Sequence, residues 1–381
     1  MELFNPHSAD WLLNKFKIYT DLRNRDAAYW SERYQMYVIT RYDDVFHVLN
    51  NPDVFSSAQG NLIVENSNRF GLTLGASDNP VHNVYKNIVK KAYNKDNLQR
   101  INDCFINQAT QLLSNKSTIN VSEIIEELSA WTTAEILNLP YDKTKIKDLV
   151  FDIQRHSSPA VSENINDASY TKLVNIIWTL TTLSKTASTG PGIYHEFMSN
   201  NPDKLNTISL FTGPAISGAS SLTSALQSLT LDLFRENQLG LLINDRKLIP
   251  SAVNESLRLH ASTGRFSRTV TQDITLHNVK LLPGTRVAVC LDSANRDPLV
   301  FEDPDKFIIT RNTSKHLGFG YGVHACIALA ISKMLMTSWI EILLDNVGLY
   351  KVTTNDFKYV MTASGNNDMI SNLVIDKEHY E

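Results

Sequence analysis

One cysteine near the end of the chain has neighbours that could turn its thiol into a metal ligand. Cys326 follows two closely spaced glycines, Gly320 and Gly322, and precedes an apolar segment at 327–344. Glycines allow the backbone to pass close to a flat ligand with its N–H groups uncovered. Such N–H groups, with a helix N-terminus behind them, lower the pKa of a thiol and favour the thiolate. This arrangement suits an axial thiolate on a haem iron, whereas most lone cysteines are buried structural residues.

The residues around Cys326 resemble the haem-binding loop of the cytochrome P450 family. That loop has Phe, two residues, Gly, one residue, His or Arg, one residue and Cys. The family has glycine two places after the cysteine, where this chain has Ala328, so the following helix would approach the haem with an extra methyl group. The resemblance implies that Cys326 is the iron ligand. The other residues of this loop that it implies for cofactor binding are Phe319, Gly320 and His324.

The composition argues against several classes of protein. The chain has 381 residues, and its 36 basic and 40 acidic side chains give a net charge of −4, which favours neither nucleic acid nor an anionic membrane. The three cysteines, Cys104, Cys290 and Cys326, do not suit a disulfide framework and indicate a reducing compartment. The first 17 residues lack the order of a signal peptide, and Lys333 and Glu341 interrupt the longest apolar run. We therefore expect a cytoplasmic protein without a membrane anchor.

Hydrophobic spacing and turn residues predict mostly helices with a smaller β region. Residues 10–50 should form a helix, two short strands and a helix, followed by a long loop at 58–77. A helix should begin near Pro80, and two more should lie within 99–150. Residues 156–192 should form a flexible helix-loop-helix. Further helices are expected at 205–235, bent at Pro214, and at 252–260, with a strand from 287.

Similarity to the family extends well beyond the cysteine loop. The run Arg41-Tyr42-Asp43-Asp44-Val45 and the run Ala294-Asn295-Arg296-Asp297-Pro298 are similar to its bacterial members, and the matches keep the expected order. The resemblance implies the α+β cytochrome P450 fold, mostly helical with a smaller β region. No repeat or linker divides the chain, so we expect one domain over residues 1–381.

Four basic or imidazole side chains are candidates for holding the haem propionates. His82 and Lys86 are four residues apart and share a helix face, and the family has His and Arg at this spacing. Lysine keeps the charge but loses the two-pronged hydrogen bonding of arginine. By position, Arg268 and His316 are the other two candidates. The alternative for His82 and Lys86 is a solvated helix face.

A second charged set should support the fold. Glu255 and Arg258 are three residues apart on one helix, and the family has a Glu-x-x-Arg pair here that a second arginine, Arg311 in this chain, completes. An exposed pair of this kind contributes less than about 1 kcal/mol. A buried network costs several kcal/mol to break. We favour the buried network, which would support folding and haem loading without taking part in chemistry.

The oxygen-binding part of the family's long central helix falls on Ser220 and Ser221. The family commonly has an acid followed by threonine there, to relay protons and hold water. Serine keeps a hydroxyl donor and acceptor but cannot gather protons from solvent as a carboxylate does. The alternatives are a shifted alignment or a proton route through water or through the substrate.

Substrate contacts are harder to predict. The resemblance assigns the substrate wall to 58–77, 156–190, 261–267 and 361–367, which are relatively polar and suggest a substrate with polar groups or one tethered to a carrier. Within them, Arg265 could bind a substrate carboxylate or phosphate, and the alternative is a surface arginine.

The family resemblance implies a haem b oxidoreductase. Such an enzyme activates dioxygen to oxidise a small organic substrate, here in the biosynthesis of a specialised metabolite, and takes electrons from a ferredoxin or flavodoxin with its reductase. Three alternatives stay open: a peroxide-driven or otherwise atypical enzyme, such as one for coupling or desaturation; a haem-thiolate protein that only binds a ligand; and a helical structural protein with chance motifs.

Overall fold

The computed structural model describes most of the chain. The described residues are 2–6, 8–25, 27–65, 67, 70–114, 118–137, 179, 192–201, 203, 206, 210, 213–235, 238–346, 350–352, 357–361 and 368–377. The predicted helix-loop-helix at 156–192 lies outside these residues except at 179 and 192, as does nearly all of the predicted substrate segment at 361–367.

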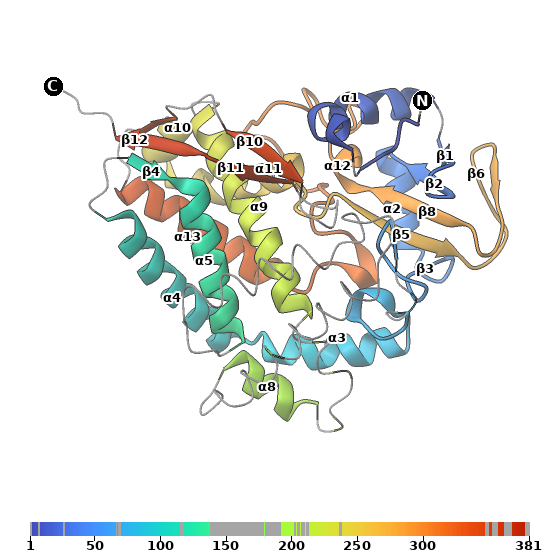
Figure 1. Cartoon of the computed structure of the whole chain (residues 1–381), viewed down its shortest axis with the longest axis horizontal. Coiled ribbons are helices and arrows are strands. Elements are labelled where there is room, and N and C mark those ends of the chain that lie inside the picture. Colours follow the sequence, from blue (N-terminus) through green and yellow to red (C-terminus); the bar gives the residue numbers. More distant parts are fainter. Residues whose placement is uncertain are drawn as a thin grey trace.

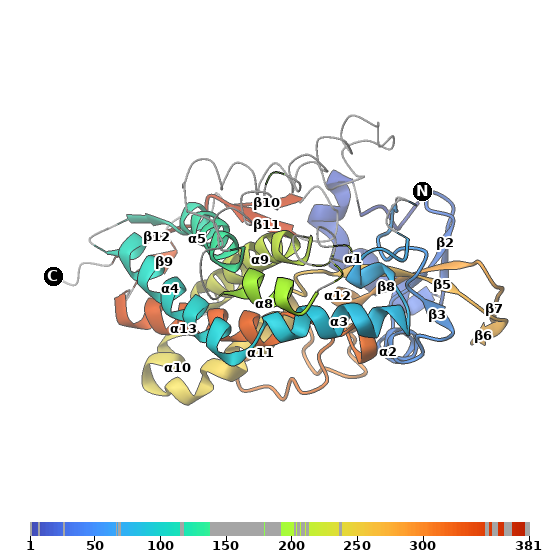
Figure 2. The same ribbon diagram turned by 90° about the horizontal axis from the view of Figure 1, so that it is seen from below.

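Helices form the larger part of the molecule and gather on one side of it (Figure 1). The central helix α9 contacts α5, α11 and α13, and their apolar faces share one large hydrophobic core. The helix α3 lies at the bottom of the molecule in Figure 1 and crosses the middle of the view from below, near α8 and α4 (Figure 2). The helices are α1 (Ala9–Arg25), α2 (Tyr42–Asn50), α3 (Val81–Ala92), α4 (Lys95–Leu113), α5 (Val121–Ile136), α8 (Ile193–Ser199), α9 (Gly213–Arg235), α10 (Leu239–Asn244), α11 (Ile249–Leu259), α12 (Leu291–Ala294) and α13 (Leu329–Asn346).

The strands form one five-stranded sheet and three small ones. The large sheet has the order β1-β2-β8-β5-β3, and only β2 and β8 pair in parallel. The strands are β1 (Tyr29–Ser31), β2 (Met36–Ile39), β3 (Phe55–Ser56), β4 (Thr118–Asn120), β5 (Arg265–Val270), β6 (Ile274–Leu276), β7 (Val279–Leu281), β8 (Arg286–Cys290), β9 (Tyr350–Val352), β10 (Lys358–Met361), β11 (Asp368–Ser371) and β12 (Val374–Lys377).

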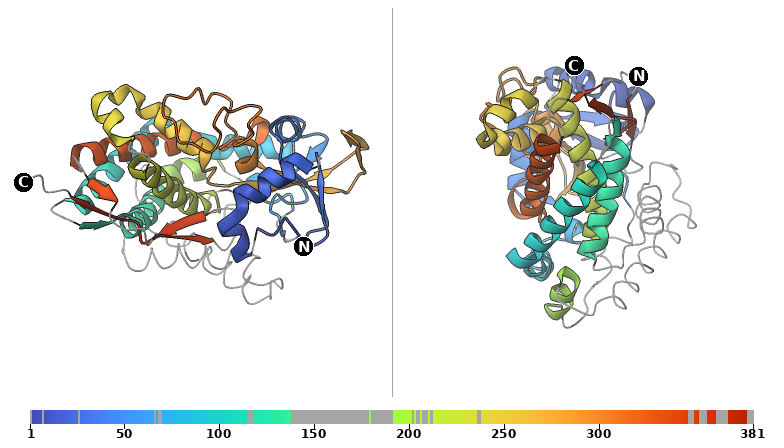
Figure 3. Two further views of the ribbon diagram at one scale, coloured as in Figure 1. Left: turned by 90° about the horizontal axis from the view of Figure 1, so that it is seen from above. Right: turned by 90° about the vertical axis from the view of Figure 1, so that its left-hand side faces the viewer.

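Alternating side chains let the large sheet pack on both faces. On β8, Val287 and Val289 join the core beneath α2, whereas Ala288 and Cys290 join the core beneath α1. The helix α1 lies beside the sheet, at the end of the molecule away from β12 (Figure 3). The sheet thus packs in a hydrophobic core on each face, and it connects the N-terminal 60 residues to residues 265–290.

Most predicted elements in the described part of the chain are present. The helix, two strands and helix at 10–50, the helix start beside Pro80 and the helix around Glu255 are confirmed. The helix α9 is described from Gly213 to Arg235, within the predicted helix at 205–235. Residues 211 and 212 lie outside the described residues, so a bend at Pro214 stays a prediction.

Glu255, Arg258 and Arg311 form a buried network, as favoured from the sequence. The side chains of Glu255 and Arg258 are 0% exposed and joined by two hydrogen bonds of 2.8 Å. Arg311 Nε donates to the second oxygen of Glu255 (3.0 Å). Arg258 also donates to the carbonyls of Asn295 (2.8 Å) and Pro304 (2.7 Å), so the network joins α11 to the loop that follows α12.

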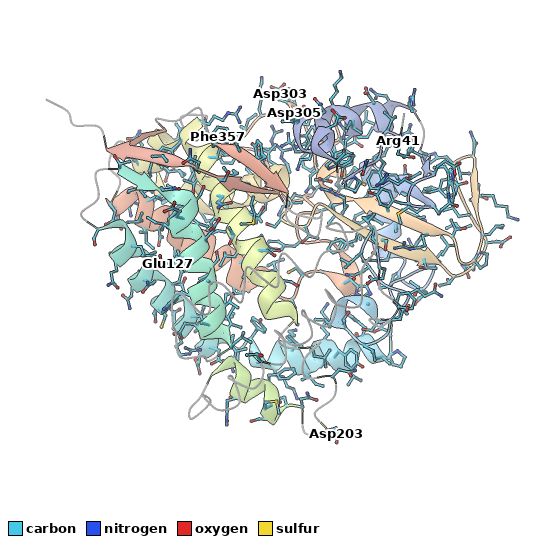
Figure 4. The ribbon with its side chains drawn as sticks, viewed as in Figure 1. Arg41, Glu127, Asp203, Asp303, Asp305 and Phe357 are labelled. Atoms are coloured by element: carbon cyan, nitrogen blue, oxygen red, sulfur yellow. The ribbon has the colours of Figure 1, made fainter. Side chains whose placement is uncertain are left out.

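The loop after α12 is fixed on its outer side as well. Arg311 Nη2 donates to the carbonyl of Asp303 (3.0 Å), and Arg296 pairs with Asp305 at 2.7 Å. Asp303 and Asp305 lie beside each other at the edge of the molecule near α1 (Figure 4).

Replacing Glu255 by Gln should destabilise the fold strongly, because two buried guanidinium groups would lose their counter-charge. We expect a loss of about 3–5 kcal/mol in the free energy of unfolding, measured by urea denaturation of the apoprotein. The matched control is Arg246→Gln, which removes the exposed Arg246–Asp345 pair and should change that free energy by less than about 1 kcal/mol. Equal effects of the two variants would show that the buried network does not stabilise the fold.

Candidate functional site

The loop before Cys326 is a compact turn closed by its own backbone. The Cys326 N–H donates to the carbonyl of Phe319 (2.9 Å), and the Ala325 N–H donates to that of Gly322 (3.1 Å). Gly320 and Gly322 have φ values of 70° and 71°, in the left-handed region that favours glycine. A Cβ on Gly322 would also lie 3.0 Å from the carbonyl oxygen of Leu49 in α2. The loop therefore requires glycine at 322 both for its turn and for its packing.

The thiol of Cys326 has a backbone donor aimed at it. The Ala328 N–H hydrogen-bonds the sulfur, and α13 begins one residue later. Solvent reaches the side chain of Cys326 in the protein alone. The predicted lowering of its pKa is wrong for the protein alone: burial raises the pKa of Cys326, although the Ala328 N–H and Lys86 act in the opposite direction.

Two histidines lie against each other beside the cysteine loop. The rings of His82, in α3, and His324, in the loop, are 4.2 Å apart, and the carboxylate of Asp78 is 4.0 Å from His324 Nε2. Burial lowers the pKa of both histidines; Lys86 adds to this at His82, and Arg268 and His82 do so at His324. Among the described residues, the buried Nδ1 of His82 has no hydrogen-bond partner. An acceptor such as a carboxylate would suit this atom.

Arg268 and Lys86 bring cationic groups to the same place. Arg268, in β5, is 5% exposed and donates to the carbonyl of Ser267 (2.7 Å). Burial lowers its pKa to about 10, while the carboxylate of Asp78 acts to raise it. Lys86 Nζ donates to the carbonyl of Val323, which ties α3 directly to the cysteine loop. His82, His324, Arg268 and Lys86 thus form one group, which we call the basic cluster.

His316 lies apart from the basic cluster. Its Nδ1 accepts from the Gly318 N–H (3.1 Å), and its ring lies 6.5 Å from that of Phe319. Burial lowers its pKa to about 4, and Lys333 and Arg258 add to the effect. The hydrogen bond and the ring contact are with the loop itself, and a part for His316 in propionate binding stays a prediction.

Ser220 and Ser221 lie in the first half of α9. Ser220 Oγ donates to the carbonyl of Ser217 (3.0 Å), one turn earlier in the helix. Ser221 is half-buried. Neither residue supplies a carboxylate, and their suggested part in proton delivery stays a prediction.

Arg265 lies in a different setting from either one that we expected. The side chain is 1% exposed, pairs with Asp292 at 3.4 Å and stacks 5.2 Å from the ring of Trp11. It is therefore no surface residue, and it is engaged in the core beneath α1. We replace the suggested substrate contact by a structural role that fastens α1 to the sheet.

The sequence alone missed Asp78 and the Ala328 N–H. Asp78 accepts hydrogen bonds from Ser56 Oγ (2.5 Å) and the Ser57 N–H (2.9 Å) while it faces the basic cluster. An acidic residue just before the helix that carries His82 and Lys86 was the available signal. The Ala328 amide could be found only once the turn at Cys326 was known.

Comparisons with known proteins agree with this site. A sequence profile described as Cytochrome P450 matches residues 241–362. Pulcherriminic acid synthase of Bacillus subtilis is 25% identical over an alignment of 408 positions, which covers 98% of this chain and 98% of that protein. Steroid C26-monooxygenase of Mycolicibacterium smegmatis is 24% identical over 83% of each chain.

Solved structures show the same fold. Cytochrome P450 CYP109Q5 from Chondromyces apiculatus matches with a TM-score of 0.84 and 20% identity, over 99% of this chain and 98% of that one. P450BioI, in complex with an acyl carrier protein that carries hexadec-9-enoic acid, matches with a TM-score of 0.82 and 19% identity over 97% and 99% of the two chains. Together with the cysteine loop, these similarities support a cytochrome P450 of the bacterial type.

Proposed function

We propose that this chain binds haem b through Cys326 and uses dioxygen to oxidise a small organic substrate. The observation that carries the proposal is the thiol of Cys326, which accepts from the Ala328 N–H in a glycine-shaped turn beside a basic cluster. A thiolate needs such donors to serve as an axial ligand. When bound, the haem supplies the dioxygen activation.

The basic cluster fits the propionate groups of that cofactor. Arg268 is buried and positively charged, and His82 has a buried nitrogen without a partner among the described residues. A carboxylate would satisfy both groups with charge-assisted hydrogen bonds. We assign propionate binding to His82, Lys86, Arg268 and His324, and we keep His316 as a predicted partner whose present contacts lie elsewhere.

The surface of α3 supports an electron-donating protein as partner. The helix exposes Lys90 and Lys91 and contains no acidic residue, and its half-buried Lys86 touches the cysteine loop. A ferredoxin or flavodoxin with an acidic face would be attracted to such a surface. We infer that one of these proteins, with its reductase, supplies the electrons, and that no nucleic acid or membrane is involved.

The proposed function includes a cellular location and a domain organisation. In the described part of the chain, no helix has the length and apolar character needed to cross a bilayer. We propose a cytoplasmic enzyme whose residues 1–381 form one domain.

We propose a substrate from specialised metabolism. Support comes from the Bacillus subtilis relative, which is named pulcherriminic acid synthase. A carrier-tethered substrate is supported by the structure of P450BioI, whose ligand is an acyl chain attached to a carrier protein.

Cys326→Ser should abolish the thiolate-type carbon monoxide spectrum of the reduced protein and its oxidase activity, because a hydroxyl cannot replace the thiolate ligand. Cys104→Ser is the matched control, since Cys104 lies in α4 away from the cysteine loop, and should leave both unchanged. A Cys326→Ser protein that still gave the thiolate band would refute the proposed ligand.

Arg268→Met should weaken haem retention more than Lys86→Met, because a buried guanidinium can donate two hydrogen bonds to one carboxylate. We expect the rate of haem transfer to an apo-globin acceptor to rise roughly tenfold for Arg268→Met, in line with one lost charge-assisted bond. Lys90→Met, on the exposed face of α3, is the control. Equal rates in all three variants would contradict the assignment.

The missing distal acid favours atypical chemistry as the second candidate. If Ser220 and Ser221 occupy the acid–alcohol positions, electrons should be poorly coupled to product with generic substrates, because no carboxylate gathers protons there. The measurement is product formed per reductant consumed, and turnover with peroxide, for the wild type and for Ser220→Asp with Ser221→Thr. Coupling should improve in the double variant. Tight wild-type coupling on several unrelated substrates, unchanged in the variant, would show that the acid is not needed.

A further inference from the structure

A short segment, residues 60–65, lies against the large sheet without being a strand itself. The two residues of β3 pair only with the C-terminal end of β5, which leaves the edge of β5 open at Ser267. There the Ser267 N–H donates to the carbonyl of Asn61 (2.9 Å) and the Ser267 Oγ to that of Leu62 (2.7 Å). We call residues 60–65 the anchored segment, because these bonds fasten it where a strand would otherwise pair.

Arg286, in the neighbouring strand β8, holds the same segment. Its Nη2 donates to the carbonyl of Leu62 (2.7 Å) and to the Oγ of Ser267 (2.8 Å), and its Nη1 donates to the carbonyl of Ile63 (3.1 Å). The planar guanidinium can reach two successive carbonyls and a hydroxyl at once, which the single ammonium of lysine cannot do in the same geometry. One side chain thus joins two strands and the anchored segment.

The anchored segment is also shaped from within. The carboxylate of Glu65 accepts from the N–H groups of Asn61 (2.8 Å) and Leu62 (3.0 Å). Gly60 has a φ of 96°, and a Cβ there would lie 2.1 Å from Glu65 Cγ. The side chain of Ile63 is 3% exposed and packs into the core beneath α1. Backbone, carboxylate and core contacts therefore all favour one conformation.

The anchored segment begins a loop that is fastened at its other end as well. Asp78 binds Ser56 and the backbone of Ser57, which closes the base of the loop. Between these two attachments lie two exposed apolar side chains, Phe70 (39%) and Leu72 (45%). The position of this apolar part relative to the sheet depends on both attachments.

We propose that Arg286 is a positioning residue that fixes the anchored segment as a rigid part of the substrate wall and thereby determines which substrates bind. The proposal rests on the proposed function, since loop 58–77 faces a substrate only in a haem enzyme of this family. Arg286 would act through the carbonyls that it holds.

The first test measures the anchor without relying on activity. Arg286→Met keeps the length and apolar stem of the side chain and removes its donors, and amide hydrogen exchange reports on the segment. We expect exchange at Asn61, Leu62 and Ser267 to be roughly tenfold faster or more, since three hydrogen bonds are lost. The control is Lys280→Met, which removes an exposed pair with Asp273 on the β6–β7 hairpin and should leave these amides unchanged. Unchanged exchange in Arg286→Met would overturn the proposal.

The second test measures selection. Dissociation constants for a panel of ligands, from the shift of the haem Soret band, should change unequally in Arg286→Met, so that the ratio between the best and other ligands falls roughly tenfold. An equal change for every ligand, or none, would overturn the role in selection. If Arg286→Met does not fold, Ser267→Ala, which removes only the bonds of that hydroxyl, takes its place with the same readouts. A wild-type protein that takes up no haem would refute the proposed function, whereas the exchange experiment would still decide whether Arg286 holds the segment.

Discussion

Glu255 is fully buried in the middle of the protein. A buried carboxylate is stable in its charged form only when positively charged groups pair with it. Arg258 and Arg311 both bind it, and Arg258 has carbonyl partners besides. One of those carbonyls belongs to Asn295, whose side chain accepts from the Leu317 N–H (2.6 Å) just before the cysteine loop. The position of the chain at the start of the cysteine loop therefore depends on the pairing of Glu255 with its two arginines. The cysteine loop is therefore linked to charged residues that lie outside it.

A second electrostatic condition applies at the basic cluster. His82, His324 and Arg268 are crowded together, and Asp78 is a single carboxylate beside them. Burial lowers the pKa of both imidazoles, and the neighbouring cationic groups add to the effect. The arrangement favours an incoming anion over an incoming cation. It is also assembled from three distant parts of the chain, so it exists only in the folded protein.

Local signals carried much of what could be predicted from the sequence. The glycine spacing before Cys326 depends on backbone conformation within eight residues, and the pairing of Glu255 with Arg258 depends on one turn of helix, so both were accessible. The effect of Pro214 on α9 was not accessible in this way, since an isolated proline is compatible with either a bend or a helix start.

The sequence-based predictions that failed concern features that contacts between distant residues determine. Arg265 faces the core because β5 pairs it with Cys290, a register that the sequence does not contain. The raised pKa of Cys326 follows from how many atoms surround it, which no spacing reveals. Contacts between distant parts of the chain thus set features that local sequence patterns do not contain.

The parallel pairing of β2 with β8 has a consequence for how the protein is made. Val38 pairs with Ala288, and the difference of 288 − 38 is 250 residues. At translation rates of about 5–20 residues per second, the ribosome needs roughly 12–50 s to supply the partner. During that time the apolar strand Met36–Ile39 has no parallel neighbour on the nascent chain. After the N-terminal hairpin is synthesised, the edge of β2 therefore stays unpaired and prone to aggregation for many seconds. We expect chaperones that bind nascent chains to bind this protein during its synthesis.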